Sequence, residues 1–154
     1  MAVFYSDGVQ FNYATRGPGP DTFIFQHGIG GSQAQPLRFL QLSGNEGPGI
    51  DGSHPCIQKL RPAAFDFRAH GRTALGDPAK LRLEIFADDL VAFLDHLQVE
   101  QAVLGGISMG AAVALIAALR YPERCIALVL SRLPGWTAPC PQRQLRLTRR
   151  QSHL

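Results

Sequence analysis

The segment Leu104-Gly105-Gly106-Ile107-Ser108-Met109-Gly110 decides how this chain folds, because it joins two elements that each predict a buried position. Residues 102–104, Ala-Val-Leu, form an apolar run too short for a surface helix and predict a strand buried on both faces. Residues 109–120 are rich in alanine and apolar on nearly every side, which predicts a central helix packed closely on a sheet. One tight turn therefore connects a buried strand to the helix that covers it.

The turn from Gly106 to Gly110 has the pattern Gly-x-Ser-x-Gly, which is typical of a serine nucleophile presented between a strand and a helix. Such a sharp reversal forces Ser108 into a strained backbone conformation, and the two glycines allow strand and helix to approach without collision. The helix N-terminus, with the amide of Met109, favours negative charge that develops beside the hydroxyl. The bare pattern also arises by chance in glycine-rich and alanine-rich segments, but its position favours the nucleophile.

A second glycine-rich loop, His27-Gly28-Ile29-Gly30-Gly31, directly follows the apolar run Phe23-Ile24-Phe25. This is where an oxyanion loop belongs in a fold with a Gly-x-Ser-x-Gly turn. The glycines allow the backbone amide of Ile29 to point at a substrate oxygen, alongside the amide of Met109. We interpret His27 as a hydrogen-bonding residue that braces the loop, rather than as a catalytic base.

The rest of the chain alternates short apolar runs with helical patterns, which predicts an α/β fold with a mostly parallel sheet. Further strands are predicted at 63–65 and 126–130, and a hairpin at 3–13 around Asp7-Gly8. The pattern from Phe86 to Leu97 predicts an amphipathic helix, with an apolar stripe toward the sheet and acidic residues on the opposite side. The stripe consists of Phe86, Leu90, Phe93, Leu94 and Leu97, and the acidic residues are Asp88, Asp89 and Asp95. The stretch from Gly44 to Pro55 is predicted to be a long loop.

With a third motif, Asp66-Phe67-Arg68-Ala69-His70-Gly71-Arg72-Thr73, the chain resembles the α/β-hydrolase family over about residues 1–136. It is most similar to small esterases and enol-lactonase-like members. The family usually has glycine where this chain has Ala69, and we expect Asp66, Arg68 and His70 to brace the loop. The resemblance implies an α/β-hydrolase fold with a truncated, mostly parallel sheet flanked by helices. It also implies hydrolysis of a small ester or lactone through an acyl-enzyme on Ser108, without a cofactor or metal.

The family places its catalytic acid and then its histidine after the serine. Beyond Ser108 this sequence has one carboxylate, Glu123, and one histidine, His153. Glu123 is expected at the wrong end of the helix, and no motif before His153 returns it to the site. Residues 137–154 are expected to form an irregular basic tail after a truncated core, and a premature end or a shifted reading frame is our hypothesis. A sheet that lacks its later strands leaves an open edge that can self-associate.

Two other classes of function stay open at this point. One is a catalytically inactive fragment of the hydrolase fold that serves as a binding module, which the missing acid and histidine favour. The other is a nucleotide-binding α/β domain, because Gly28-Ile29-Gly30 follows a strand. It is weaker, since the fingerprint requires glycine at the position of Gln33, and the sequence has no Gly-Lys-Ser/Thr phosphate loop.

Length, charge and cysteine content limit the number of domains, the kinds of partner and the cellular location. The 154 residues suit one domain, and the net charge of +3 arises at the end of the chain, where residues 124–154 hold 6 Lys/Arg and no Asp/Glu. Residues 1–123 hold 9 Lys/Arg against 12 Asp/Glu, which argues against a nucleic-acid surface. No apolar run is long enough to cross a membrane. Without a recognisable leader and with three dispersed cysteines, we expect a cytoplasmic protein with reduced thiols.

Overall fold

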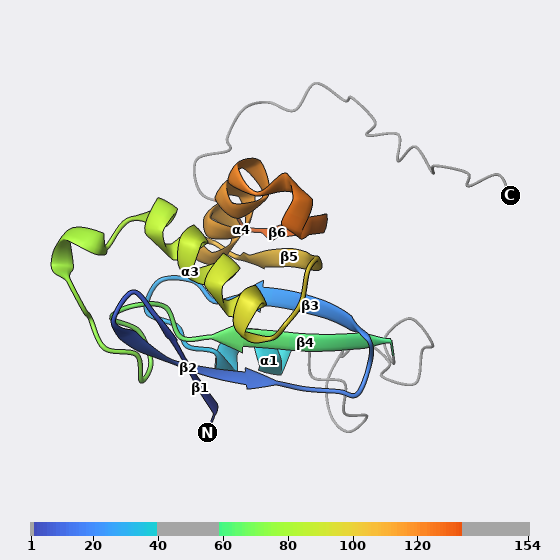
Figure 1. Cartoon of the computed structure of the whole chain (residues 1–154), viewed down its shortest axis with the longest axis horizontal. Helices are drawn as coiled ribbons and strands as arrows, with labels where there is room; N and C mark the ends of the chain where they lie inside the picture. Colours follow the sequence, from blue (N-terminus) through green and yellow to red (C-terminus); the bar gives the residue numbers. More distant parts are fainter. Residues whose placement is uncertain (1, 40–58, 134–154) are drawn as a thin grey trace, which may run out of the picture.

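The computed structural model describes residues 2–39 and 59–133, which form one sheet with helices packed on it (Figure 1). The described strands lie in the order β1-β2-β4-β3-β5-β6. They are β1 (Ala2–Ser6), β2 (Val9–Thr15), β3 (Asp21–Gln26), β4 (Leu60–Phe65), β5 (Ala102–Ile107) and β6 (Cys125–Ser131). The helices are α1 (Ala34–Phe39), α3 (Leu83–His96) and α4 (Met109–Arg120), with short 3-10 turns η1 (Pro78–Lys80) and η2 (Pro122–Arg124).

The four strands β4, β3, β5 and β6 run parallel, as the sequence predicted. β1 and β2 form the predicted antiparallel hairpin, and β2 continues it onto β4. The hairpin turn is made by Asp7 and Gly8, which both have positive φ angles, 47° and 74°. Two consecutive left-handed residues are the conformation that a tight two-residue hairpin requires. The α/β class and the mostly parallel sheet are therefore confirmed.

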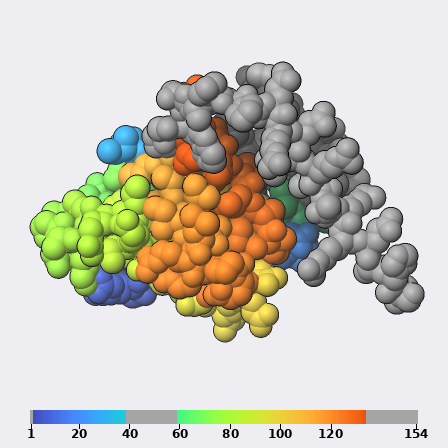
Figure 2. All heavy atoms as spheres, turned by 90° about the horizontal axis from the view of Figure 1, so that it is seen from above, coloured from blue at the N-terminus to red at the C-terminus, as the bar shows by residue number. Residues whose placement is uncertain are grey.

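The apolar side of α3 closes a core of aromatic rings. Phe4, Phe11 and Phe65 pack edge to face or stacked with centroid distances of 4.8–5.7 Å, and Phe93 of α3 joins them at 5.0 Å from Phe4. α3 packs on α4, and α4 lies on β5 and β6. Seen from above in Figure 2, α4 (orange) forms the middle of the visible face, next to the yellow-green residues around the start of α3. The predicted amphipathic helix and the central helix are both present.

One prediction for this helix is wrong. Asp89 was expected on the side of α3 opposite the apolar stripe, but it is 1% exposed. It lies three residues after Phe86 and four before Phe93, so it shares their face of the helix. Its carboxylate accepts hydrogen bonds from Arg68 Nε at 2.7 Å and from an Arg68 terminal nitrogen at 2.8 Å. The buried guanidinium of Arg68, which comes from a loop distant in sequence, therefore takes the place of water as the partner of the Asp89 carboxylate.

The sequence also gave no sign of α1, whose six residues follow the loop after β3. Three other expectations fall outside the described residues: the loop 44–55, the thiols of Cys56 and Cys140, and the basic tail 137–154. Cys125 lies within them and is a free, partly buried thiol. No helix in the ranges 2–39 and 59–133 combines the length and apolar character needed to cross a membrane.

Candidate active site

Ser108 occupies a single-residue turn between β5 and α4. Its backbone angles are φ 54° and ψ −114°, so it is outside the helix and in a region that residues with a side chain rarely adopt. Its amide donates a hydrogen bond to the carbonyl of Ser131 at 2.9 Å, which ties the turn to the end of β6. The side chain is partly exposed. A strained serine at a helix N-terminus is the geometry that the sequence pattern predicts for a nucleophile.

The two glycines of the turn are required by close backbone contacts. A Cβ atom on Gly106 would overlap the backbone of Gly110, and one on Gly110 would lie 2.5 Å from the carbonyl oxygen of Gln26 and 2.6 Å from that of His27. Both positions therefore exclude any larger residue without backbone movement. The same contacts bring the first turn of α4 against the end of β3, where the second glycine-rich loop begins.

This second loop is a β-turn from Gly28 to Gly31. The Gly31 amide donates to the Gly28 carbonyl at 3.0 Å, and Gly30 has a positive φ angle of 72°. Ile29 occupies the first central position of the turn, and its side chain is 80% exposed. A Cβ on Gly28 would lie 3.5 Å from the Ser108 Cβ, so the loop and the serine turn are close neighbours.

The backbone amides of Ile29 and Met109 are among those of this region that have no acceptor within the ranges that the structure describes. Met109 is the first residue of α4, and the first amides of a helix have no partner inside it. The turn around Ile29 is closed by the Gly31 amide, so the Ile29 amide takes no part in that hydrogen bond. Two unpaired donors thus lie on the two segments that meet at Ser108.

His27 uses both of its ring nitrogens within the fold. Nε2 accepts a hydrogen bond from the Phe67 amide at 3.2 Å, so the proton is on Nδ1, which donates to the Gly28 carbonyl at 2.8 Å. The ring is fully buried, and this burial lowers the pKa of the imidazole. A neutral ring with no free nitrogen braces the loop and has no lone pair to offer Ser108.

The third motif connects to the glycine-rich loop through one buried carboxylate. Asp66 accepts hydrogen bonds from the amide of Gln33 at 2.6 Å and from that of Arg72 at 2.9 Å. A Cβ atom on Gly71 would overlap this carboxylate, which explains the glycine there. Asp66 therefore fixes the end of the loop that carries Ile29 to the turn after β4.

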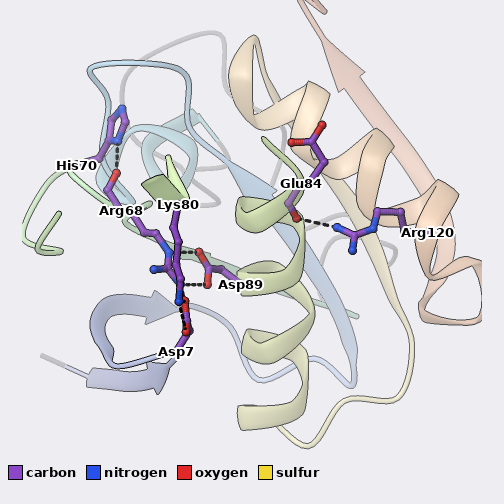
Figure 3. A network of polar contacts seen from close by, with 7 residues as sticks. All are labelled: Asp7, Arg68, His70, Lys80, Glu84, Asp89 and Arg120. Carbon is purple, nitrogen blue, oxygen red and sulfur yellow. Dashed lines mark hydrogen bonds and ion pairs between the residues drawn. The ribbon is translucent and has the colours of Figure 1, made fainter. Parts of the chain in front are cut away.

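Arg68, in the same motif, is the centre of a polar network that sequence reasoning did not find (Figure 3). It is fully buried, pairs with Asp89 of α3, and reaches Asp7 of the hairpin at 3.1 Å. The hydrogen bond with Asp89 raises the pKa of the Arg68 guanidinium, and Lys80 lowers the pKa of the Asp7 carboxyl. His70 Nδ1 lies 2.8 Å from the Arg68 carbonyl. The motif is thus fastened to two other elements.

Ala69 occupies the position where the family usually has glycine. Its φ angle is 61°, in the left-handed region, and its amide donates to the Ala74 carbonyl at 3.2 Å. The turn therefore keeps a conformation that favours glycine and holds an alanine in it at some cost.

An open hollow of about 790 Å³ lies beside the serine turn. The described residues that line it come from the glycine-rich loop, α1, the Asp66 motif and the position before Ser108: Gly30, Gly31, Ser32, Ala34, Gln35, Arg38, Gly71 and Ile107. Gln35 and Arg38 lie on the short helix α1, which no pattern in the sequence indicated.

A base and an acid for Ser108 are not among the described residues that follow it. The carboxylate there is Glu123, in η2, and α4 separates it from Ser108 by 12 residues, about 18 Å at ~1.5 Å per residue. This agrees with the expectation for Glu123, and His153 lies outside the described residues. Within the described ranges, no group of three or more His, Cys, Asp or Glu side chains is arranged to hold a metal ion.

Comparison with known proteins gives a consistent result. A family model described as alpha/beta hydrolase fold matches residues 21–142. A 3-oxoadipate enol-lactonase from Acinetobacter baylyi is 38% identical over 134 residues, which is 80% of this chain and 44% of that protein. A strigolactone esterase from Pisum sativum is 29% identical over 120 residues, 78% of this chain and 41% of that protein.

Among solved structures, an enzyme described as degrading N-acyl homoserine lactones superposes with a TM-score of 0.65 at 28% identity. The match covers 84% of this chain and 44% of that one. This chain thus spans less than half the length of each of these three relatives.

Proposed function

Since the chain belongs to the α/β hydrolase fold family, we propose that the protein is a serine hydrolase of small esters or lactones and that Ser108 is its nucleophile. The observation that carries the proposal is the backbone of Ser108, held at φ 54° at the start of α4. Strain of this kind persists only where the surrounding structure imposes it, and it concentrates at functional sites. The relatives support the substrate class, because their names describe an enol-lactonase and an esterase.

The proposed chemistry is acyl transfer to the serine and then to water. Ser108 Oγ attacks the substrate carbonyl carbon, its proton passes to a base, and the amides of Ile29 and Met109 stabilise the oxyanion that forms. The carbon–oxygen bond to the leaving alcohol then breaks, and the alcohol takes up the proton. Water hydrolyses the acyl-enzyme by the same route in reverse, releasing the acid and free Ser108.

The base decides how fast this chemistry runs. In the family the base is a histidine that follows the serine, but this sequence offers His153 alone in that position. Full activity is therefore proposed for a protein that supplies the acid and histidine. For the chain as given, we expect the residual rate that remains when triad members are deleted, about 10³ to 10⁴ over water in a well-studied enzyme.

The test is labelling with a fluorophosphonate probe, which reacts with activated serines. Wild-type protein is compared with Ser108→Ala, and a short activated ester is assayed in parallel. We expect slow labelling that disappears in Ser108→Ala. Labelling that persists in the variant would place the reactive group elsewhere and overturn the proposal. A thermal shift with a dinucleotide, measured on the same samples, examines the nucleotide-binding alternative.

A specific observation favours a second function, that of an interaction module. Strand β6 is the last of the described sheet, pairs with β5 on one side, and exposes much of its apolar surface. Ile126 is 62% exposed, Val129 43% and Leu130 36%. An edge strand with unpaired backbone groups and apolar side chains on both faces is suited to pairing with another strand.

The module hypothesis predicts concentration-dependent self-association through β6. Sedimentation velocity is the measurement, and Leu130→Lys is the variant, because a charge on an edge strand opposes pairing. We expect wild type to shift toward dimer at high concentration and Leu130→Lys to stay monomeric with an unchanged melting curve. A wild-type chain that stays monomeric throughout would argue against the module and leave the hydrolase proposal intact.

A further inference from the structure

We infer that the hollow beside Ser108 selects substrates that carry a carboxylate, and that Arg38 is the residue that binds it. This inference rests on the proposed hydrolase function and adds the substrate class. It starts from the described residues that line the hollow, among which Arg38 is the one charged side chain and none is a carboxylate. The remaining lining groups are glycine backbone, a serine hydroxyl, the Gln35 amide and the apolar Ala34 and Ile107.

The charge of Arg38 is not compensated by the described residues. No ion pair or hydrogen bond involves its guanidinium there, in contrast to two arginines later in the sequence, Arg120 and Arg124. Arg120 contacts Asp88 at 2.7 Å, and Arg124 contacts Asp95 at 2.7 Å. Asp66, whose carboxylate lies next to the lining residue Gly71, already accepts hydrogen bonds from the amides of Gln33 and Arg72. Among the described residues, Arg38 therefore brings to the hollow a positive charge that an anionic ligand can neutralise.

The hollow lies next to the turn that carries Ser108. Ile107 lines it and immediately precedes Ser108, while Gly30 and Gly31 belong to the turn that starts at Gly28, where an added Cβ would lie 3.5 Å from the Ser108 Cβ. A substrate whose carbonyl is at Ser108 thus extends into the hollow and meets Arg38. A guanidinium presents a planar pair of donors that matches the two oxygens of a carboxylate, and a neutral amide of the same shape gains much less from it.

The proposal can be tested by binding, without turnover. Ser108→Ala protein is titrated with glutarate, the product expected of a glutarate half-ester, and with its neutral isostere glutaramide, by isothermal calorimetry or amide chemical shifts. We expect glutarate to bind at least about tenfold more tightly than glutaramide, and we expect this preference to weaken as the ionic strength rises. Equal affinity for the two compounds, or no binding of glutarate, would overturn the inference.

Variants assign the effect to Arg38. Arg38→Gln should lose about tenfold in glutarate affinity and leave glutaramide unchanged, whereas Arg38→Lys should keep part of the preference. The matched control is Arg82→Gln, which removes an exposed arginine that caps α3 without a side-chain hydrogen bond. If Arg82→Gln weakens glutarate as much as Arg38→Gln, the effect is general charge and the assignment fails.

The glutarate binding experiment and the serine labelling experiment can fail independently of each other. Serine labelling without a preference for glutarate would leave the hydrolase proposal standing and remove the substrate class. A preference for glutarate without serine labelling would keep Arg38 as an anion site and remove the hydrolase. Should Arg38→Gln fail to fold, as judged by its melting curve, the glutarate and glutaramide comparison with its salt dependence still decides the inference.

Discussion

Strands β3 and β6 are both apolar and both belong to the parallel part of the sheet, yet they differ greatly in solvent exposure. In β3, Ile24 and Phe25 are 0% and 2% exposed, whereas in β6, Ile126 and Leu128 are 62% and 38% exposed. β3 has a strand on each side, and its carboxyl end is enclosed by the serine turn and the Asp66 motif. β6 has β5 on one side among the described strands. Apolar composition makes burial favourable, but neighbouring elements decide whether it occurs.

Many contacts therefore hold the β3 end of the sheet, which includes Ser108, and few hold the β6 edge. Substitutions in the first region should lower the free energy of unfolding strongly, and those in the second only slightly. Leu130→Thr, on β6, serves as the common reference for the stability predictions below. It should cost about 1 kcal/mol or less, because its side chain is already 36% exposed and has less apolar surface to lose.

The largest effect is expected at Asp89. Asp89→Asn removes the buried counter-charge of Arg68 and leaves it the part-exposed Asp7 alone, and breaking a buried pair from one side costs about 3–5 kcal/mol. Urea unfolding followed by circular dichroism measures it. The double variant Arg68→Met with Asp89→Leu should recover most of the loss, because it removes both charges together. If Asp89→Asn lowers the free energy of unfolding as little as Leu130→Thr does, the two regions do not differ in the way described.

The next effect is expected at Gly110. Gly110→Ala places a methyl group 2.5 Å from the Gln26 carbonyl oxygen, so β3 and α4 must separate. We expect a destabilisation of about 2–3 kcal/mol by thermal or urea unfolding, in the range typical of overpacking. Gly30→Ala is a useful contrast, because a Cβ there meets nothing within 4 Å and its cost comes from the φ angle of 72° alone.

Fluorophosphonate labelling of Gly110→Ala adds a second readout. The substitution moves the first turn of α4 relative to the loop that carries Ile29, so we expect labelling of Ser108 to fall more than the folded fraction does. Labelling that follows the folded fraction alone would show that the turn tolerates the shift.

Acid pH should weaken the same region through His27. Burial lowers the pKa of this imidazole below its ordinary 6.5, so the unfolded chain binds the proton more readily than the folded chain. The stabilising neutral form is therefore fully present above about pH 6.5 and is lost as the pH falls from there toward the lowered folded pKa. The slope is at most about 1.4 kcal/mol per pH unit.

Urea unfolding between pH 7.5 and pH 5 measures this slope. His27→Gln is the control, because it keeps hydrogen-bonding groups on the side chain and removes the titration. An identical pH dependence in His27→Gln would assign the slope to other groups.

The smallest effect is a gain in stability. Ala69→Gly relieves the left-handed strain at φ 61°, and the gain is reduced by the extra chain entropy of glycine, which leaves about 0.5–1 kcal/mol. The side chain is exposed, so no packing is lost. Ala74→Gly, which lies at the other end of the same hydrogen bond, is the control and should not stabilise the protein. A loss of stability in Ala69→Gly would mean that the turn is not strained.

The sequence by itself determined the α/β class, the parallel strands, the hairpin at Asp7-Gly8 and the position of Ser108 between strand and helix. These features are encoded locally, in the period of apolar residues and in glycines at fixed spacing, so neighbours along the chain are sufficient to predict them. Only the tertiary structure decided that Asp89 is buried against Arg68, that Asp66 secures the glycine-rich loop after β3, and that Arg38 faces the hollow beside the serine. Each of these depends on a partner more than twenty residues away, and the solvent exposure of a side chain is set by what packs on it.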